Sequence, residues 1–239
     1  MKKVIICITV LFLSGLFCAH TINEENMQYQ NSFIIWAHSD IQPRSPEEKI
    51  QYEKAVKDIS TNFTTVDMAL MAGDIVQFSH FNEIYPWYLN TRKKAPVKEW
   101  LDIAGNHDWR AIGLYKKYIN RQLHYSVTKG NLLILMMSNE IPGRPTYISD
   151  ETFKWWKDMV VKNQDKIIIT VTHGAIEGSG IMASHLNRLI ILDSKRFRDI
   201  LKKYRMDIWL SGHSHFPGWM PNMHNKNKDT GNTVFIDLG

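Results

Sequence analysis

Short apolar runs alternate with amphipathic stretches along most of this 239-residue chain. Residues 33–37, 68–72 and 132–137 are uninterrupted apolar runs, whereas residues 46–60 carry apolar side chains at helical spacing. Uninterrupted apolar runs of strand length are typical of strands that are buried on both faces, and helices between such strands indicate a layered domain. The pattern therefore predicts an α/β fold.

The same pattern predicts the other elements of one domain over residues 32–239. Ser45 is expected to cap the first helix, with Pro46 as its first residue. Gly239 closely follows the last predicted strand, which leaves open a domain that is trimmed at its C-terminus. We expect further strands at residues 100–104, 167–171, 207–210 and 234–236, and further helices at residues 150–163 and 194–204.

Five of the predicted strands are followed at once by a short polar segment. In α/β folds, ligands bind beyond the carboxyl ends of the strands, so these segments are expected to lie close together. They offer carboxylate, amide and imidazole groups, a mixture that suits zinc, manganese or iron. The sequence therefore predicts a metal site. The segments are residues 39–42, 73–74, 105–108, 172–174 and 212–215.

The first 19 residues have the pattern of a secretory signal peptide. Two lysines precede an apolar stretch over residues 4–17, which is short for a membrane span. Ala19 suits the position before a cleavage site, but Phe17 is large for its position. An uncleaved signal anchor and a lipid attached through Cys18 therefore remain as alternatives. Residues 20–31 are polar and are expected to form a spacer. We expect a secreted or periplasmic protein.

Cysteine content and charge narrow the range of functions. Cys7 and Cys18 both lie within the predicted signal peptide, so the mature chain is expected to have no disulfide and no thiolate ligand. The formal net charge is +5, with no long run of lysine or arginine. This balance gives no indication of a nucleic-acid partner, although an anionic substrate is compatible with it. No stable membrane span is expected after cleavage.

The order of the polar segments resembles the calcineurin-like metallophosphoesterase superfamily. Its signature runs D-x-H, G-D, G-N-H-[D/E], a single histidine and G-H-x-H, and the resemblance extends from Asp40 to His215. Position 42 departs from it, because Gln42 stands where most members have histidine. Gln77 also stands where purple acid phosphatases have tyrosine. The resemblance implies a four-layer αββα sandwich of two mixed sheets.

The resemblance also implies two metal ions, divalent or of mixed valence (Mn, Fe or Zn). Asp74 would bridge them, and Asp40 and His215 would complete the first metal site. Gln42 is then either an oxygen ligand of the first metal or only a hydrogen-bonding residue. The remaining implied ligands, all on the second metal, are Asn106, His173 and His213.

The resemblance further implies a phosphoesterase that acts on a small phosphorylated substrate, a phosphomonoester or phosphodiester, through a hydroxide bound by both metals. His107 would be the general acid for the leaving group, with Asp108 orienting its ring. Arg110 follows this motif and is either a phosphate-binding residue or a surface arginine. A binding protein with a weakened metal site is the alternative function. The substrate and the oligomeric state are not determined by the sequence.

Overall fold

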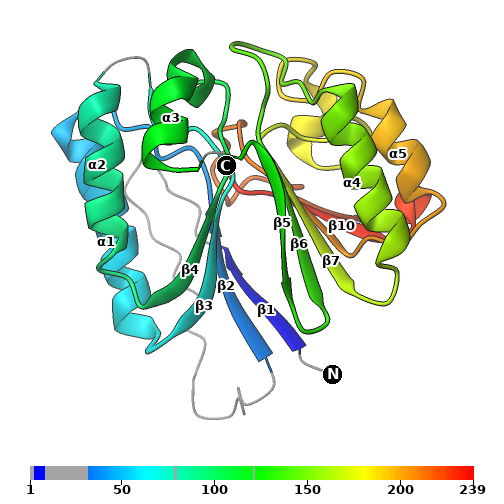
Figure 1. Cartoon of the computed structure of the whole chain (residues 1–239), viewed down its shortest axis with the longest axis horizontal. Helices are drawn as coiled ribbons and strands as arrows, with labels where there is room; N and C mark the ends of the chain where they lie inside the picture. The colour runs from blue at the N-terminus through cyan, green and yellow to red at the C-terminus, as the bar shows by residue number, and fades with distance from the viewer. Residues whose placement is uncertain (1–2, 9–31, 78–79, 121) are drawn as a thin grey trace.

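The computed structural model describes residues 3–8, 32–77, 80–120 and 122–239. The predicted spacer and most of the predicted signal peptide lie outside these residues. Within the described part of the chain, no helix is long and apolar enough to cross a membrane. Two β-sheets lie face to face, with helices on the outer side of each (Figure 1).

The first sheet has the strand order β1-β2-β3-β4, and every neighbouring pair of strands is parallel. The α/β architecture with two sheets flanked by helices was predicted correctly, but this sheet is parallel throughout its described strands and not mixed. The strands are β1 (Lys3–Ile8), β2 (Ser32–His38), β3 (Val66–Met71) and β4 (Val97–Asp102).

The second sheet is mixed and has the strand order β5-β6-β7-β8-β10-β9. Its central strands β6, β7, β8 and β10 are parallel, while β5 and β9 pair antiparallel at the two edges. Its strands are β5 (His124–Lys129), β6 (Leu132–Met137), β7 (Ile167–Thr172), β8 (Ile208–Ser211), β9 (His224–Asn227) and β10 (Thr233–Asp237).

The helices cover the outer faces of the two sheets, α1 and α2 on one side and α4 and α5 on the other (Figure 1). Short 3-10 helices occupy Asp108–Ala111, Met182–His185 and Lys228–Thr230. The α-helices are α1 (Pro46–Asn62), α2 (Phe81–Arg92), α3 (Ile112–Tyr118), α4 (Asp150–Lys162) and α5 (Lys195–Leu201).

The strands are apolar on both faces because they separate different hydrophobic cores. In β6, Leu132 and Ile134 belong to the core between the two sheets, whereas Leu133 and Leu135 belong to the core under α4 and α5. Side chains of a strand alternate between its faces, so an uninterrupted apolar run supplies both cores. This is the physical reason why the apolar runs predicted the layered fold.

The sequence signals for helix ends predict some of the observed helices correctly and miss others. The Ser45 hydroxyl accepts a hydrogen bond from the Glu48 backbone N–H at 3.3 Å and begins α1, as predicted. The sequence pattern gives no prediction for α2, because Pro86 lies inside it and proline disfavours a helix interior. The last predicted helix is shorter than expected, since α5 ends at Leu201.

Candidate metal centre

The five polar segments follow β2, β3, β4, β7 and β8, at the upper end of the molecule in Figure 1. Four of the predicted ligands there have a left-handed backbone conformation. Residues other than glycine rarely adopt this backbone conformation, and such backbone strain concentrates at functional sites. The φ angles are 55° for Asp40, 56° for Asp74, 71° for His213 and 55° for His215.

Asp74 lies at the centre of two groups of potential metal ligands. In the first, which we call the buried group, ligand atoms of Asp74, His173 and His213 lie within 4.8 Å of one another. In the second, the half-exposed group, the same limit holds for Asp40, Asp74 and His215. One carboxylate therefore belongs to both groups, which is the arrangement that a bridging ligand requires.

Backbone carbonyls orient the two imidazoles of the buried group. His173 Nδ1 lies 2.8 Å from the carbonyl oxygen of Ala72, and His213 Nε2 lies 3.1 Å from that of Arg188. When these nitrogens donate to the carbonyls, the other ring nitrogens become available to a cation, as is usual for metal-binding histidines. The predicted amide also joins this group, because Asn106 Oδ1 lies 3.1 Å from His173 Nε2.

The half-exposed group is more open to solvent than the buried group, and it contains a second carboxylate, that of Asp40. His215 Nε2 lies 3.3 Å from Asp40 Oδ1, and the His215 side chain is 27% exposed. Asp40 Oδ2 accepts hydrogen bonds from the His213 backbone N–H at 2.8 Å and the Ser39 hydroxyl at 2.5 Å. Gln42 reaches this group with its amide nitrogen, which lies 2.7 Å from His215 Nε2.

The donor atoms fit cations on electrostatic grounds. Asp40 Oδ1, Asp74 Oδ2 and His213 Nδ1 are buried and make no hydrogen bond within the described part of the chain. Buried polar atoms without partners are costly, and a bound cation removes that cost. Burial favours the neutral ring of His173, but the carboxylates of Asp74 and Asp40 outweigh this effect and raise its pKa to about 9. The site therefore attracts positive charge.

Two glycines allow the ligand loops to approach this closely. Gly73 has a φ of 96°, and a Cβ atom there would lie 2.7 Å from the Gly105 backbone nitrogen. This agrees with the sharp turn that was predicted before Asp74. At Gly212 the constraint is space, because a Cβ atom would lie 2.5 Å from Asp40 Oδ2.

His107 lies beside the shared carboxylate, as its predicted role requires. Its backbone N–H donates to Asp74 Oδ1 at 2.8 Å, and its Nε2 lies 3.8 Å from Asp74 Oδ2. Its Nδ1 lies 2.9 Å from the backbone carbonyl oxygen of Gln77. The His107 side chain is 7% exposed, so only a small part of it reaches the surface.

The role of Asp108 in orienting the His107 ring stays a prediction, and the contacts of its carboxylate in this structure are with other groups. The Asp108 carboxylate accepts hydrogen bonds from the backbone N–H groups of Gly105 at 2.9 Å and Ile75 at 3.2 Å, and from the Tyr85 hydroxyl at 3.0 Å. Burial and the nearby Asp74 carboxylate raise the pKa of Asp108 to about 7. Asp108 therefore connects the loops after β3 and β4, and the Gln77 backbone carbonyl is one partner of the His107 ring.

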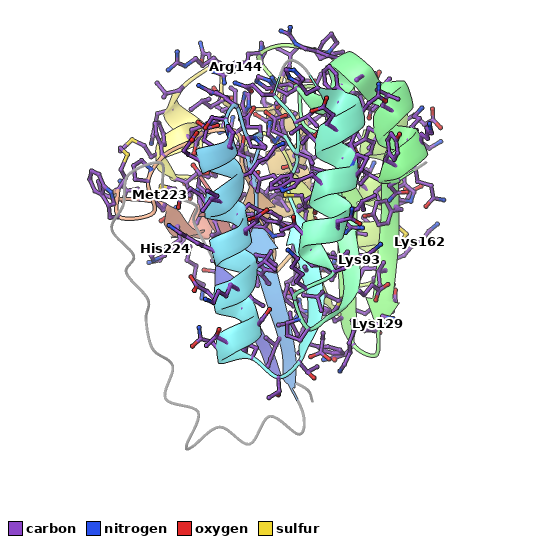
Figure 2. All side chains as sticks on the ribbon, turned by 90° about the vertical axis from the view of Figure 1, so that its left-hand side faces the viewer. Lys93, Lys129, Arg144, Lys162, Met223 and His224 are labelled. Atoms are coloured by element: carbon purple, nitrogen blue, oxygen red, sulfur yellow. The ribbon has the colours of Figure 1, made fainter. Side chains whose placement is uncertain are left out.

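Charged residues around the centre were only partly predicted. Arg110 is exposed on the 3-10 helix Asp108–Ala111, and its role as a phosphate-binding residue stays a prediction. Arg144 was not predicted; its positive charge helps to lower the pKa of His213, after burial and His173. Figure 2 shows Arg144 at the end of the molecule opposite Lys129.

A calcineurin-like phosphoesterase family model matches residues 33–217, which is most of the chain. The chain belongs to this family. It is accordingly a phosphoric ester hydrolase, and its family implies a dinuclear divalent metal centre. No curated protein sequence matches the chain.

Solved structures of two phosphatases share the fold of this phosphoesterase. A dimetal phosphatase from Danio rerio superposes with a TM-score of 0.70 at 8% sequence identity, covering 85% of this chain and 86% of that chain. A purple acid phosphatase from yellow lupin (Lupinus luteus) seeds superposes with a TM-score of 0.61 at 13% identity. That match covers 86% of this chain but only 43% of the lupin protein.

Proposed function

We propose that this phosphoesterase hydrolyses a small phosphomonoester or phosphodiester at the Asp74 centre. One observation carries the proposal: the Asp74 carboxylate belongs to both ligand groups, so this one side chain would help to hold both cations. Family membership supports the same reaction class. The proposed substrate is small because the centre is largely buried.

Each ligand group would hold one ion of Mn, Fe or Zn. In the half-exposed group, Asp40, His215 and Asp74 would hold the first ion. In the buried group, the second ion would be held by Asp74, Asn106, His173 and His213. Two such ions supply an activated water and neutralise charge on the phosphoryl oxygens. Gln42 is assigned to the half-exposed group, where its amide nitrogen faces His215.

His107 is the proposed proton donor to the leaving oxygen. The Gln77 carbonyl holds Nδ1 at 2.9 Å, and the backbone hydrogen bond to Asp74 Oδ1 holds the residue in place. Nε2 is thereby directed toward the shared carboxylate, where the ester would bind. A proton donor at this position assists the departure of a basic alkoxide more than that of a stabilised phenolate.

His107→Ala tests this assignment. The variant should keep its fold and metal content but lose about 10²- to 10⁴-fold in turnover of an alkyl phosphate, the usual weight of general acid catalysis. The loss should shrink for a nitrophenyl ester, whose leaving group needs little protonation. Turnover is compared on both esters at matched metal loading.

Equal losses on both esters would contradict a role at the leaving group. If the unmodified enzyme shows no metal-dependent turnover of either ester type, the proposed reaction itself is wrong, and the alternative of a phosphoesterase-fold binding protein gains support.

We also propose that the enzyme is secreted or periplasmic, on the basis of the basic and apolar pattern of residues 1–19. In the full chain β1 pairs with β2 at the edge of the first sheet. Cleavage after Ala19 would remove β1. Mass spectrometry of protein from the extracellular or periplasmic fraction should give a chain that begins near His20. An intact N-terminus on protein confined to the cytoplasm would contradict secretion.

A further inference from the structure

A cavity of about 500 Å³ lies beside the candidate metal centre, where the start of α1 faces the start of α2. Arg44, Lys49 and His80 contribute basic side chains to its lining, and Glu83 is the one acidic residue among the lining residues. This volume lies within the range of pockets that bind small organic molecules. The lining therefore combines adequate space with an excess of positive charge.

Among the described residues, the side chains of Arg44 and Lys49 are not neutralised by a carboxylate, although the Arg44 backbone N–H donates to Glu48 Oε2 at 2.5 Å. Within the described part of the chain neither forms an ion pair, whereas Arg92 binds Asp102 at 2.8 Å and Arg198 binds Glu177 at 3.3 Å. Lys49 instead lies 5.7 Å from the centre of the Trp87 ring. The positive charge of both side chains can therefore attract an anion that enters the cavity.

Arg44 is fixed at the border between this cavity and the metal centre. The Gln77 side-chain amide is oriented so that its oxygen faces hydrogen-bond donors. In this orientation the oxygen accepts hydrogen bonds from Arg44 Nε at 2.8 Å and Nη2 at 2.9 Å. Gln77 also contacts His107, because His107 Nδ1 lies 2.9 Å from the Gln77 backbone carbonyl oxygen and, in this orientation, 2.9 Å from the Gln77 amide nitrogen. A second cavity of about 130 Å³ is lined by Arg44 together with Asp40 and His215.

We propose that the larger cavity binds the organic part of the substrate, and that Arg44 and Lys49 bind an anionic group on it. The proposal rests on the proposed function, because the phosphoryl group must lie at the Asp74 centre. From there the leaving group passes His107, and Gln77 connects His107 to Arg44. The substrate class is thus a phosphate ester whose alcohol carries a carboxylate or a second phosphate.

A matched pair of esters tests the anionic group directly: 4-carboxyphenyl phosphate and its neutral carboxamide analogue. The unmodified enzyme should prefer the carboxylate. Arg44→Gln should lower kcat/KM for the carboxylate by about tenfold and for the carboxamide by less than about twofold, as expected for the loss of one charged hydrogen bond. Lys49→Gln should lower the ratio of kcat/KM for the carboxylate to kcat/KM for the carboxamide by about threefold.

Lys57→Gln, on an exposed turn of α1, is the matched control and should leave the ratio unchanged. Arg44→Gln also releases Gln77, which affects both esters alike, so the ratio and not the absolute rate is the measure. Lys49 has no such contact and provides an independent variant. A carboxylate-to-carboxamide ratio that is the same in the parent, Arg44→Gln and Lys49→Gln enzymes would overturn the proposal.

Binding of a product analogue to the metal-free protein tests the anion site independently of the hydrolysis reaction. NMR titration with 4-hydroxybenzoate, the alcohol released from the first ester, should show saturable shifts near the start of α1. These shifts should be lost in Arg44→Gln and retained in Lys57→Gln. Absence of turnover with both esters would contradict the proposed function alone. Unchanged 4-hydroxybenzoate binding in both Arg44→Gln and Lys49→Gln would contradict the anion site alone.

Discussion

The two ligand groups share Asp74 but differ in how firmly the protein holds them. In the buried group the side chain of His173 is fully buried, and its second ring nitrogen lies 2.8 Å from a backbone carbonyl. In the half-exposed group the side chain of His215 is 27% exposed and contacts another side chain, Gln42. Ligands that are held rigidly lose less entropy on binding. We therefore expect the buried group to bind its ion more tightly.

The opening of the half-exposed group has a functional consequence. Asp40 and His215 line a cavity of about 130 Å³ that also contains Arg44 and Phe216. We therefore expect substrate to reach the centre from this side, and the ion held there to exchange more readily. The buried group acts as the fixed part of the centre, and the half-exposed group as the accessible part.

The largest effect should come from Asp74→Asn, because this carboxylate is the one residue that belongs to both groups. Its loss should weaken both metal sites and abolish turnover, since each group loses its central anion. Elemental analysis after metal reconstitution measures the result. Retention of both ions with normal turnover would show that another residue bridges them.

His173→Ala and His215→Ala compare the two groups directly. His173→Ala should release the tightly bound ion and leave a buried carboxylate without its partner, so thermal stability should fall as well. His215→Ala should release the more weakly bound ion and change stability less, since its ring is partly in water. Metal content and melting temperature are measured for both variants. Equal effects on both quantities would remove the distinction between the groups.

The pKa of His173 gives a pH dependence with a definite sign. Because this pKa is raised to about 9, the metal-free protein carries a proton on His173 at pH 7. A metal ligand must be deprotonated, so metal binding at pH 7 should release a proton and affinity should fall as the pH is lowered. Calorimetry in buffers of different ionisation enthalpy counts the released protons. No proton release between pH 7 and 8 would contradict a role for His173 as ligand.

The smallest effect is expected from Gln42→Ala. Its amide nitrogen, not its oxygen, lies 2.7 Å from His215 Nε2, so we expect the side chain to position His215 and not to bind the ion itself. Loss of an orienting residue typically lowers metal affinity by about tenfold or more. We expect about a tenfold loss at the half-exposed group, with both ions still bound at saturation. Complete loss of one ion, as in His215→Ala, would show that Gln42 is itself a ligand.

The sequence was sufficient to predict that the candidate ligands lie close together, because their positions follow from the ends of the strands. Asp74 follows β3 of the first sheet and His173 follows β7 of the second, and ligands in α/β folds bind beyond the carboxyl ends of the strands. Apolar runs such as β6 indicated burial on both faces without any knowledge of the partners. Layers and ligand positions are thus determined by local patterns.

Contacts between loops were not predictable in the same way. One hydrogen-bond partner of Asp108 is Tyr85 on α2. The sequence pattern did not predict α2, because Pro86 lies inside it. The Arg44–Gln77 contact joins two segments that no periodic pattern relates. Such contacts depend on how loops fold over the strand ends, and spacing along the chain carries no information about that.

A metal titration followed by turnover tests the central claim most directly. Metal-free protein is titrated with Mn²⁺ while bound metal and hydrolysis of a nitrophenyl phosphate are measured on the same samples. Two ions should bind per chain, the tighter at the buried group, and turnover should appear only as the second site fills. Saturation at one ion, or full turnover before the second ion binds, would contradict a dinuclear centre bridged by Asp74.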